Sequence, residues 1–220
     1  MFQDRLQIIT GHYGSGKTTF AVNLALDMAR AGRKVCLADM DIVNPYFRAA
    51  DSRKTLEAAG VRVIAPVYAG TNLDSPALPG ELAVMFDDPT YTVVLDVGGD
   101  DAGAAALGAY AARFREAGYA QFYVFNARRP LTSTPEETVR VLREIESISR
   151  LPATGLVNNT NLGAETDVAV LTASAAFAEQ TAALAGLPLV CTGVRQDLAE
   201  AARLCLPAVY PLTMWVMPPW

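Results

Sequence analysis

The sequence has few of the residues from which metal clusters and disulfide frameworks are built. It contains one histidine and three cysteines, Cys36, Cys191 and Cys205, and no two cysteines form a C-x-C or C-x-x-C pair. Disulfide scaffolds and zinc or iron–sulfur sites need several such residues at suitable spacing. We therefore expect neither a disulfide framework nor a metal cluster held by this chain alone.

Basic residues are also in the minority. Lys and Arg number 18 against 23 Asp and Glu, a formal net charge of −5, whereas proteins that bind nucleic acid through its phosphates usually carry a basic surplus. The first residues lack the basic and apolar segments of a secretory signal. The uncharged stretch 204–220 holds four prolines, which does not suit a spanning or anchoring helix. The sequence therefore indicates a cytoplasmic protein with no nucleic-acid partner and no membrane anchor.

What the 220-residue chain does contain is a regular alternation of short apolar runs and amphipathic segments. The apolar runs predict strands at 6–10, 35–38, 61–65, 92–95, 121–125, 153–157 and 189–192, and the tail is compatible with a last edge strand. Helices are predicted over 20–31, 51–59, 81–86, 102–117, 134–149, 167–185 and 197–204. Apolar strands joined by helices predict a single domain over 1–220: an α/β fold with one doubly wound, mostly parallel sheet and helices on both faces. Ligands bind such sheets at the carboxyl ends of the strands.

The first predicted strand runs into the P-loop (Walker A) pattern G-x-x-x-x-G-K-[ST] at 11–18. In such loops the backbone N–H groups and the following helix N-terminus surround a phosphate. We expect Lys17 to bridge the β- and γ-phosphates and the Thr18 hydroxyl to ligate Mg²⁺. His12, inside the loop, either touches phosphate or packs as a spacer. The expected nucleotide-binding residues here are Gly11, Tyr13, Gly14, Ser15, Gly16, Lys17, Thr18 and Thr19.

Carboxylates follow two further strands. Asp39 and Asp41 end the second strand and, being two apart, point the same way. Asp96 follows the strand Thr92-Val93-Val94-Leu95, the Walker B form, and Gly99 lets the backbone approach a γ-phosphate. We expect Asp39 and Asp96, with Thr18, to lie at Mg²⁺, and Asp41 to act at the γ-phosphate. Asp100 or Asp101 is interpreted as the N-cap of the next helix.

Two polar runs lie at the same edge of the predicted sheet. In the run 158–161, Asn158 is suited to reading an adenine edge through its paired donor and acceptor. The guanine-reading pattern Asn-Lys-x-Asp is missing, which favours ATP over GTP. Arg128 and Arg129 follow the fifth strand and are able to hold a phosphate or carboxylate. A solvated loop is the interpretation we prefer for them.

These motifs resemble those of the MinD/ParA-like P-loop ATPases, the CobQ/CobB/MinD/ParA nucleotide-binding family. The matching stretches are G-H-Y-G-S-G-K-T at 11–18, D-M-D-I-V-N-P-Y-F-R at 39–48, D-V-G-G-D at 96–100 and G-L-V-N-N at 155–159. These motifs are similar in sequence to those of one subgroup of the family. Resemblance to that subgroup implies no defined cellular role. The resemblance implies ATP hydrolysis that switches the binding of a protein partner, commonly through an ATP-dependent homodimer.

By motif position the resemblance also implies individual roles. Lys17 and Thr18 hold the phosphates and Mg²⁺, Asp41 orients the attacking water, Asp96 is the Walker B acid and Asn158 reads adenine. The implied cofactors are ATP or ADP and Mg²⁺, with Lys17 and Asp41 as the catalytic residues.

The chain departs from the family's patterns at three points. His12 stands where many members carry a signature Lys that reaches across the dimer, and Gly103 where the nitrogenase iron protein has a cluster cysteine. The C-x-C pair of nickel-insertion relatives is missing. The leading hypothesis is an ATP-hydrolysing switch. The alternatives are a small-molecule kinase or ligase on the same fold and a non-hydrolysing nucleotide-binding module.

Overall fold

A parallel β-sheet runs through the part of the chain that the computed structural model describes, residues 2–40, 52–64 and 86–215. Its eight strands lie in the order β3-β2-β4-β1-β5-β6-β7-β8, and every described pairing between neighbours is parallel. The strands are β1 (Leu6–Thr10), β2 (Lys34–Met40), β3 (Arg62–Ile64), β4 (Tyr91–Val97), β5 (Ala120–Phe125), β6 (Gly155–Asn158), β7 (Leu189–Arg195) and β8 (Val209–Leu212). The predicted α/β class with a doubly wound parallel sheet is confirmed.

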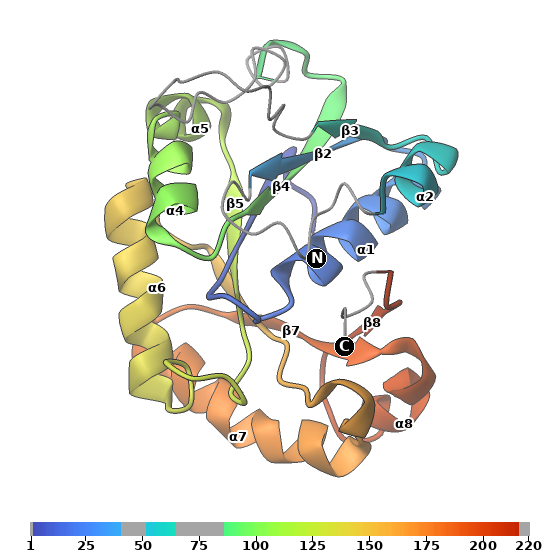
Figure 1. Ribbon diagram of the computed structural model, residues 1–220, viewed down its shortest axis with the longest axis vertical. Coiled ribbons are helices and arrows are strands. Elements are labelled where there is room, and N and C mark those ends of the chain that lie inside the picture. Colours follow the sequence, from blue (N-terminus) through green and yellow to red (C-terminus); the bar gives the residue numbers. More distant parts are fainter. Residues whose placement is uncertain (1, 41–51, 65–85, 216–220) are drawn as a thin grey trace, which may run out of the picture.

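Helices cover both faces of this sheet (Figure 1). One face packs on α1 (Lys17–Arg30) and α2 (Arg53–Ala58). The opposite face packs on α4 (Asp101–Gly108), α5 (Ala111–Ala117), α6 (Pro135–Ser149) and α7 (Val168–Ala185), with α8 (Ala199–Arg203) beside α7. Two short 3₁₀ helices, η2 (Gly163–Glu165) and η3 (Gln196–Leu198), complete the described elements. Strands buried on both sides explain why they read as continuous apolar runs.

The predicted helix over 102–117 is two helices in the structure. α4 ends at Gly108, whose carbonyl accepts a hydrogen bond from the Arg150 guanidinium at 2.7 Å. A methyl group added at Gly108 would lie 2.8 Å from the Ile148 carbonyl oxygen. Close packing against the end of α6 therefore accompanies the interruption, and the poor helix propensity of Gly108 favours it.

Other boundaries shift by a few residues, as helix and strand ends commonly do. β6 begins two residues later than predicted, β7 extends to Arg195, and the predicted helix 197–204 divides into η3 and α8. The tail does form an edge strand, β8, paired with β7. The predicted helix 81–86 lies outside the described residues except for Phe86.

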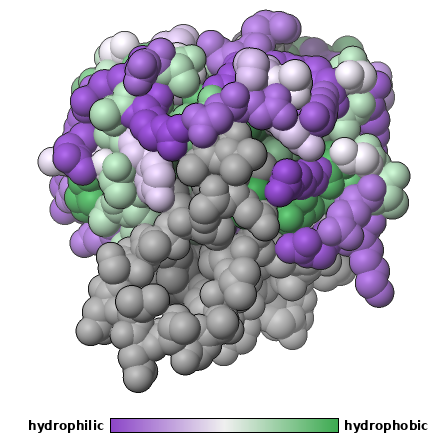
Figure 2. Space-filling view, turned by 90° about the horizontal axis from the view of Figure 1, so that it is seen from above, coloured by the Kyte–Doolittle hydropathy of each residue, from purple (hydrophilic) through white to green (hydrophobic). Residues whose placement is uncertain are grey.

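Among the described helices, α7 alone has the length and apolar composition that a membrane-crossing helix needs, and 28% of it is buried. Its buried residues pack in the core that it shares with α6 and β5, and in a second cluster with α8. Hydrophilic residues make up most of the described surface on the face shown in Figure 2. The apolar character of α7 is thus accounted for in part by packing within this fold.

Candidate functional site

The register of the sheet brings Asp39 and Asp96 together. Asp39 in β2 lies directly opposite Asp96 in β4, and Asp96 lies opposite Ile9 in β1, shortly before the P-loop. Leu37 and Val94, two residues before each carboxylate, pack in the cluster formed with α1. Because side chains alternate along a strand, both carboxylates lie on the face that α1 covers. They are 1% and 0% exposed.

The P-loop connects β1 to α1 and has the backbone conformation that its glycines allow. Gly14 and Gly16 have φ of 73° and 85°, values that side-chain-bearing residues rarely adopt. Gly16 is the N-cap of α1 and leaves that helix without a side-chain cap. Helix N-terminal N–H groups without a capping side chain are available to an anion. Lys17 and Thr18, the first residues of α1, are both buried.

The other predicted P-loop residues differ in exposure. The Ser15 hydroxyl is buried and has no hydrogen-bond partner among the described residues. Tyr13 is 53% exposed, whereas Thr19 is half-buried. Gly11 packs so closely on β5 that an added methyl group would clash with the Val124 carbonyl oxygen.

Gly99 brings the segment that follows Asp96 into contact with the P-loop backbone. A methyl group added at Gly99 would lie 2.7 Å from the Tyr13 nitrogen and 2.9 Å from the Gly11 carbonyl oxygen. Only a residue without a side chain allows this approach. The backbone of the Asp96–Gly99 segment is therefore packed directly against the backbone of the P-loop.

Asn158 does not lie where it would read a nucleotide base, which corrects the prediction made for it. Its side chain is fully buried, donates to the Ser174 hydroxyl at 2.9 Å and accepts from the Thr160 N–H at 3.1 Å. The reason is strand alternation: Val157 packs in the α1 cluster and Leu156 in the α7 cluster, so Asn158 points toward α7.

The next residue, Asn159, reaches the P-loop instead. Its amide nitrogen donates to the Ser15 carbonyl at 2.7 Å, and the same nitrogen would clash with a methyl group added at Gly16. Sequence reasoning missed this contact. The available signal was that Asn159 follows a predicted strand and alternates with Asn158.

The environment of His12 favours its neutral form. Burial lowers the pKa of its imidazole below the ordinary value of 6.5, and the nearby Lys17 ammonium lowers it further.

Arg129, interpreted from the sequence as part of a solvated loop, contacts the P-loop. Its Nε donates to the Gly14 carbonyl at 3.1 Å, although much of the side chain is exposed. Arg128 is exposed and beside it. Arg129 thus lies on an exposed loop, as the sequence interpretation preferred, and it also contacts the P-loop because the fold brings the end of β5 beside that loop.

Asp100, not Asp101, caps α4, accepting from the Gly103 N–H at 2.9 Å. A methyl group at Gly103 would lie 2.7 Å from the Gly98 carbonyl oxygen, so a cysteine there would need the backbone to shift. Asp41 lies outside the described residues.

The side-chain oxygens of Thr18, Asp39 and Asp96 are compatible with binding a Mg²⁺ ion that enters the site together with a nucleotide. No group of three or more His, Cys, Asp or Glu residues within the described ranges is able to hold a metal ion. Two carboxylates and a threonine hydroxyl are hard oxygen donors, and Mg²⁺ typically takes one or two protein carboxylates together with substrate phosphates. The residues Thr18, Asp39 and Asp96 fit that pattern.

The comparison with protein families shows to which family this chain belongs. Residues 7–159 match the model of the CobQ/CobB/MinD/ParA nucleotide-binding domain. The chain belongs to this family. The CobQ/CobB/MinD/ParA match spans β1 to the end of β6 and thus includes the P-loop, Asp39, Asp96 and Asn159. The protein is a P-loop nucleotide-binding protein of this class.

Solved structures of other proteins share the fold of this family member. Chloroplast FtsY from Physcomitrella patens is 18% identical with a TM-score of 0.61, covering 88% of this chain and 59% of its own. FtsY from Thermotoga maritima is 19% identical with a TM-score of 0.58, covering 88% and 62%. Signal Recognition Particle 54 kDa protein from Aeropyrum pernix, solved in complex with GDP, is 19% identical with a TM-score of 0.56, covering 86% and 41%.

At these low sequence identities, the structural similarity establishes a common fold but not a common function. The chain spans about three fifths of the length of the FtsY chains and less of the third. Among curated proteins, no sequence matches this family member significantly.

Proposed function

We propose that this protein is a Mg²⁺-dependent ATPase whose turnover switches the binding of a protein partner. The observation that carries the proposal is the contact of Gly99 with the P-loop backbone at Tyr13 and Gly11. Loss of a γ-phosphate held by the loop changes the contacts of this segment, and the segment follows directly on Asp96. Glycine backbone that responds to a γ-phosphate is a known means of switching.

The proposal gives individual roles to the residues of the P-loop and to the carboxylates that follow the neighbouring strands. Lys17 and the P-loop N–H groups hold the phosphates, and Thr18, Asp39 and Asp96 hold Mg²⁺. The bound metal neutralises phosphate charge. The buried position of both carboxylates limits their exposure to water, which strengthens electrostatic interactions at the site. Asp41 is proposed to orient the attacking water.

ATP is proposed as the nucleotide because the run 158–161 lacks the Asn-Lys-x-Asp pattern of guanine readers. Because Asn158 is no longer a candidate for contacting the base, the preference for ATP over GTP depends on the missing Asn-Lys-x-Asp pattern alone. The partner is proposed to be a protein, with ATP-dependent pairing of two copies as part of the cycle. A cytoplasmic location is also part of the proposal.

Phosphate release from Mg²⁺-ATP, measured over a series of protein concentrations with Mg²⁺-GTP in parallel, tests the proposal. We expect specific activity to rise with concentration, because a second copy completes the site. Lys17→Ala should abolish tight ATP binding, and Asp41→Asn should retain binding but reduce turnover.

Three results would contradict parts of this proposal. Unchanged ATP binding in Lys17→Ala would remove the P-loop from the mechanism. Faster turnover of GTP would overturn the choice of nucleotide. A near-zero, concentration-independent rate in a protein that binds ATP would contradict activation by self-pairing, and small-molecule acceptors would then be screened.

A further inference from the structure

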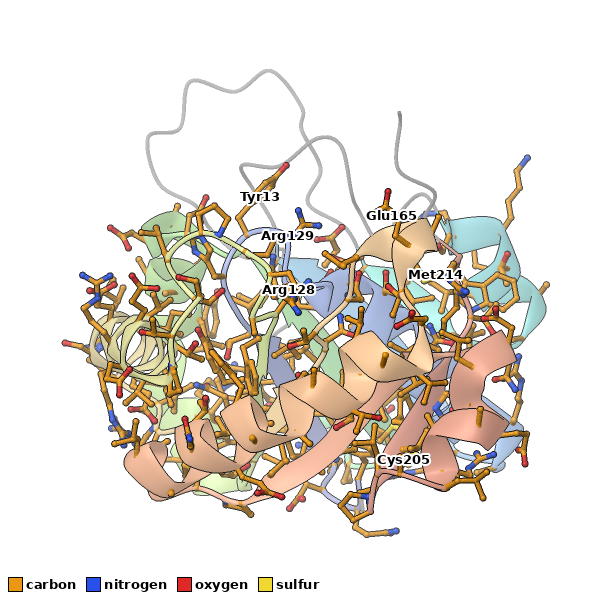
Figure 3. All side chains as sticks on the ribbon, turned by 90° about the horizontal axis from the view of Figure 1, so that it is seen from below. Tyr13, Arg128, Arg129, Glu165, Cys205 and Met214 are labelled. Atoms are coloured by element: carbon orange, nitrogen blue, oxygen red, sulfur yellow. The ribbon has the colours of Figure 1, made fainter. Side chains whose placement is uncertain are left out.

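The loop between β5 and α6 brings an arginine onto the outside of the P-loop. Arg129 donates from Nε to the Gly14 carbonyl at 3.1 Å, across 115 positions of sequence. Its Nε, Cδ and Cζ atoms would lie 3.2, 3.5 and 3.6 Å from a methyl group added at Gly14. Figure 3 shows Arg129 close to Tyr13, while Cys205 lies on the opposite side of the molecule. The guanidinium therefore covers the side of Gly14 where a side chain would stand.

Buried polar side chains hold this loop in place. Asn126, fully buried, accepts from the Arg128 N–H at 2.9 Å and donates to the Asn161 carbonyl at 3.3 Å. Thr132, also buried, donates to the Asn126 carbonyl at 2.9 Å. Leu131 has φ of 65°, a strained value for a branched side chain. Such strain persists only where surrounding contacts impose it, and it is commonest at functional sites.

Within the described residues, the guanidinium of Arg129 forms no ion pair with a carboxylate. Other arginines, such as Arg30, Arg53 and Arg143, form ion pairs with carboxylates of their own helices. In the described ranges Arg129 donates to a neutral carbonyl, through Nε alone. Its terminal nitrogens remain as donors beside a loop whose ligand is an anion.

From this arrangement we infer that Arg129 is a positioning residue for nucleotide phosphate. Its Nε contact supports the left-handed conformation of Gly14, and its positive charge, fixed at the rim of the P-loop, strengthens phosphate binding. The inference rests on the proposed function for the nature of the ligand, but it concerns binding and does not require hydrolysis. Arg128, whose side chain makes no hydrogen bond to the P-loop within the described residues, has no such part.

Titration calorimetry with ATP and ADP tests the inference on wild-type protein, Arg129→Ala, Arg129→Lys and Arg128→Ala. We expect Arg129→Ala to weaken binding of both nucleotides roughly tenfold, the size typical of a charged interaction. Arg129→Lys should recover much of the affinity because it keeps the charge. Arg128→Ala, the matched neighbour, should stay within about twofold of wild type.

A second readout separates charge from a purely structural role. Removing a cation that acts on phosphate should flatten the dependence of log Kd on log salt concentration. The thermal midpoint of the nucleotide-free protein should stay unchanged in Arg129→Ala, because Asn126 and Thr132 hold the loop.

Four outcomes would overturn the inference, and one of them concerns the proposed function as well. Equal affinities for Arg129→Ala and Arg128→Ala would overturn it while leaving the P-loop assignment intact. An unchanged dependence of log Kd on salt concentration in Arg129→Ala would also overturn it. A lowered thermal midpoint of this variant that accounts for its loss of affinity would do the same. No nucleotide binding by the wild-type protein would overturn both proposals together, with Lys17→Ala then indistinguishable from wild type.

Discussion

Gly99 is the residue through which the Asp96 segment touches the phosphate loop. Its replacement by alanine would bring a methyl group to 2.7 Å from the Tyr13 nitrogen, a backbone atom that moves only with the whole loop. Overpacking of this kind typically costs about 1–3 kcal/mol. We expect Gly99→Ala to weaken ATP binding by at least roughly tenfold, measured by titration calorimetry.

A suitable control is Gly118→Ala. Gly118 has positive φ, but a methyl group added there meets nothing within 4 Å, so this variant reports backbone strain alone. Wild-type affinity in Gly99→Ala would contradict a tight contact with the P-loop.

His12 predicts a dependence of stability on pH. Burial, with a further contribution from Lys17, lowers the pKa of the folded imidazole below 6.5. Between the lower folded pKa and 6.5 the unfolded chain binds more protons than the folded protein, so the free energy of unfolding falls as the pH drops through this window. We expect His12→Gln to remove this contribution, as measured by urea unfolding at several pH values from 5 to 8. An identical pH dependence in the variant would show that other groups cause it.

At the scale of elements, two side-chain contacts join the edge strand β8 and the residue after it to helix α1. Asn23 of α1 donates to the Thr213 carbonyl at 2.8 Å and accepts from the Thr213 N–H at 2.9 Å, immediately after β8. Tyr210 of β8 adds a bond from its hydroxyl to Asp27 of α1 at 2.8 Å. The last strand is thus held by side chains of α1 as well as by its pairing with β7.

Asn23→Ala removes the side-chain partner of the Thr213 N–H and one of the two donors to the Thr213 carbonyl, which keeps the Trp215 N–H at 3.1 Å. An intramolecular hydrogen bond typically contributes about 0.5–1.5 kcal/mol, so we expect the loss of these two bonds to lower the free energy of unfolding by about 1–3 kcal/mol in chemical denaturation. Gln180→Ala, on the exposed side of α7, is the control that should change little. Similar losses in both variants would argue against the Asn23 contact.

Helix ends were predictable where the signal is local. Thr134, Pro135 and Glu137 predict the start of α6, and the structure has the full capping box, with Thr134 accepting from the Glu137 N–H at 3.2 Å. The break between α4 and α5 was only partly predictable: Gly108 is a poor helix former, but its contacts with Arg150 and Ile148 at the end of α6 are long-range.

At the scale of the whole molecule, the sheet extends beyond the stretch that defines the family. The match ends at residue 159, yet β7 and β8 continue the same sheet by parallel pairing, with one register shift between β6 and β7 at Leu156 and Val157. The described residues are therefore joined by one set of strand pairings, in agreement with the expectation of a single domain, which remains a prediction for 1–220.

The sequence by itself determined the class of fold, the order of its elements and the P-loop, since these follow from local patterns of apolar residues, glycines and caps. It also placed Asp39 and Asp96 at one sheet edge, because parallel strands end together. Only the tertiary structure decided that Asn159 rather than Asn158 meets the P-loop, that Gly99 touches Tyr13, and that Arg129 covers Gly14. The physical reason is that each of these contacts joins segments far apart in the chain, where the lateral order of strands and the direction of each side chain choose the partner.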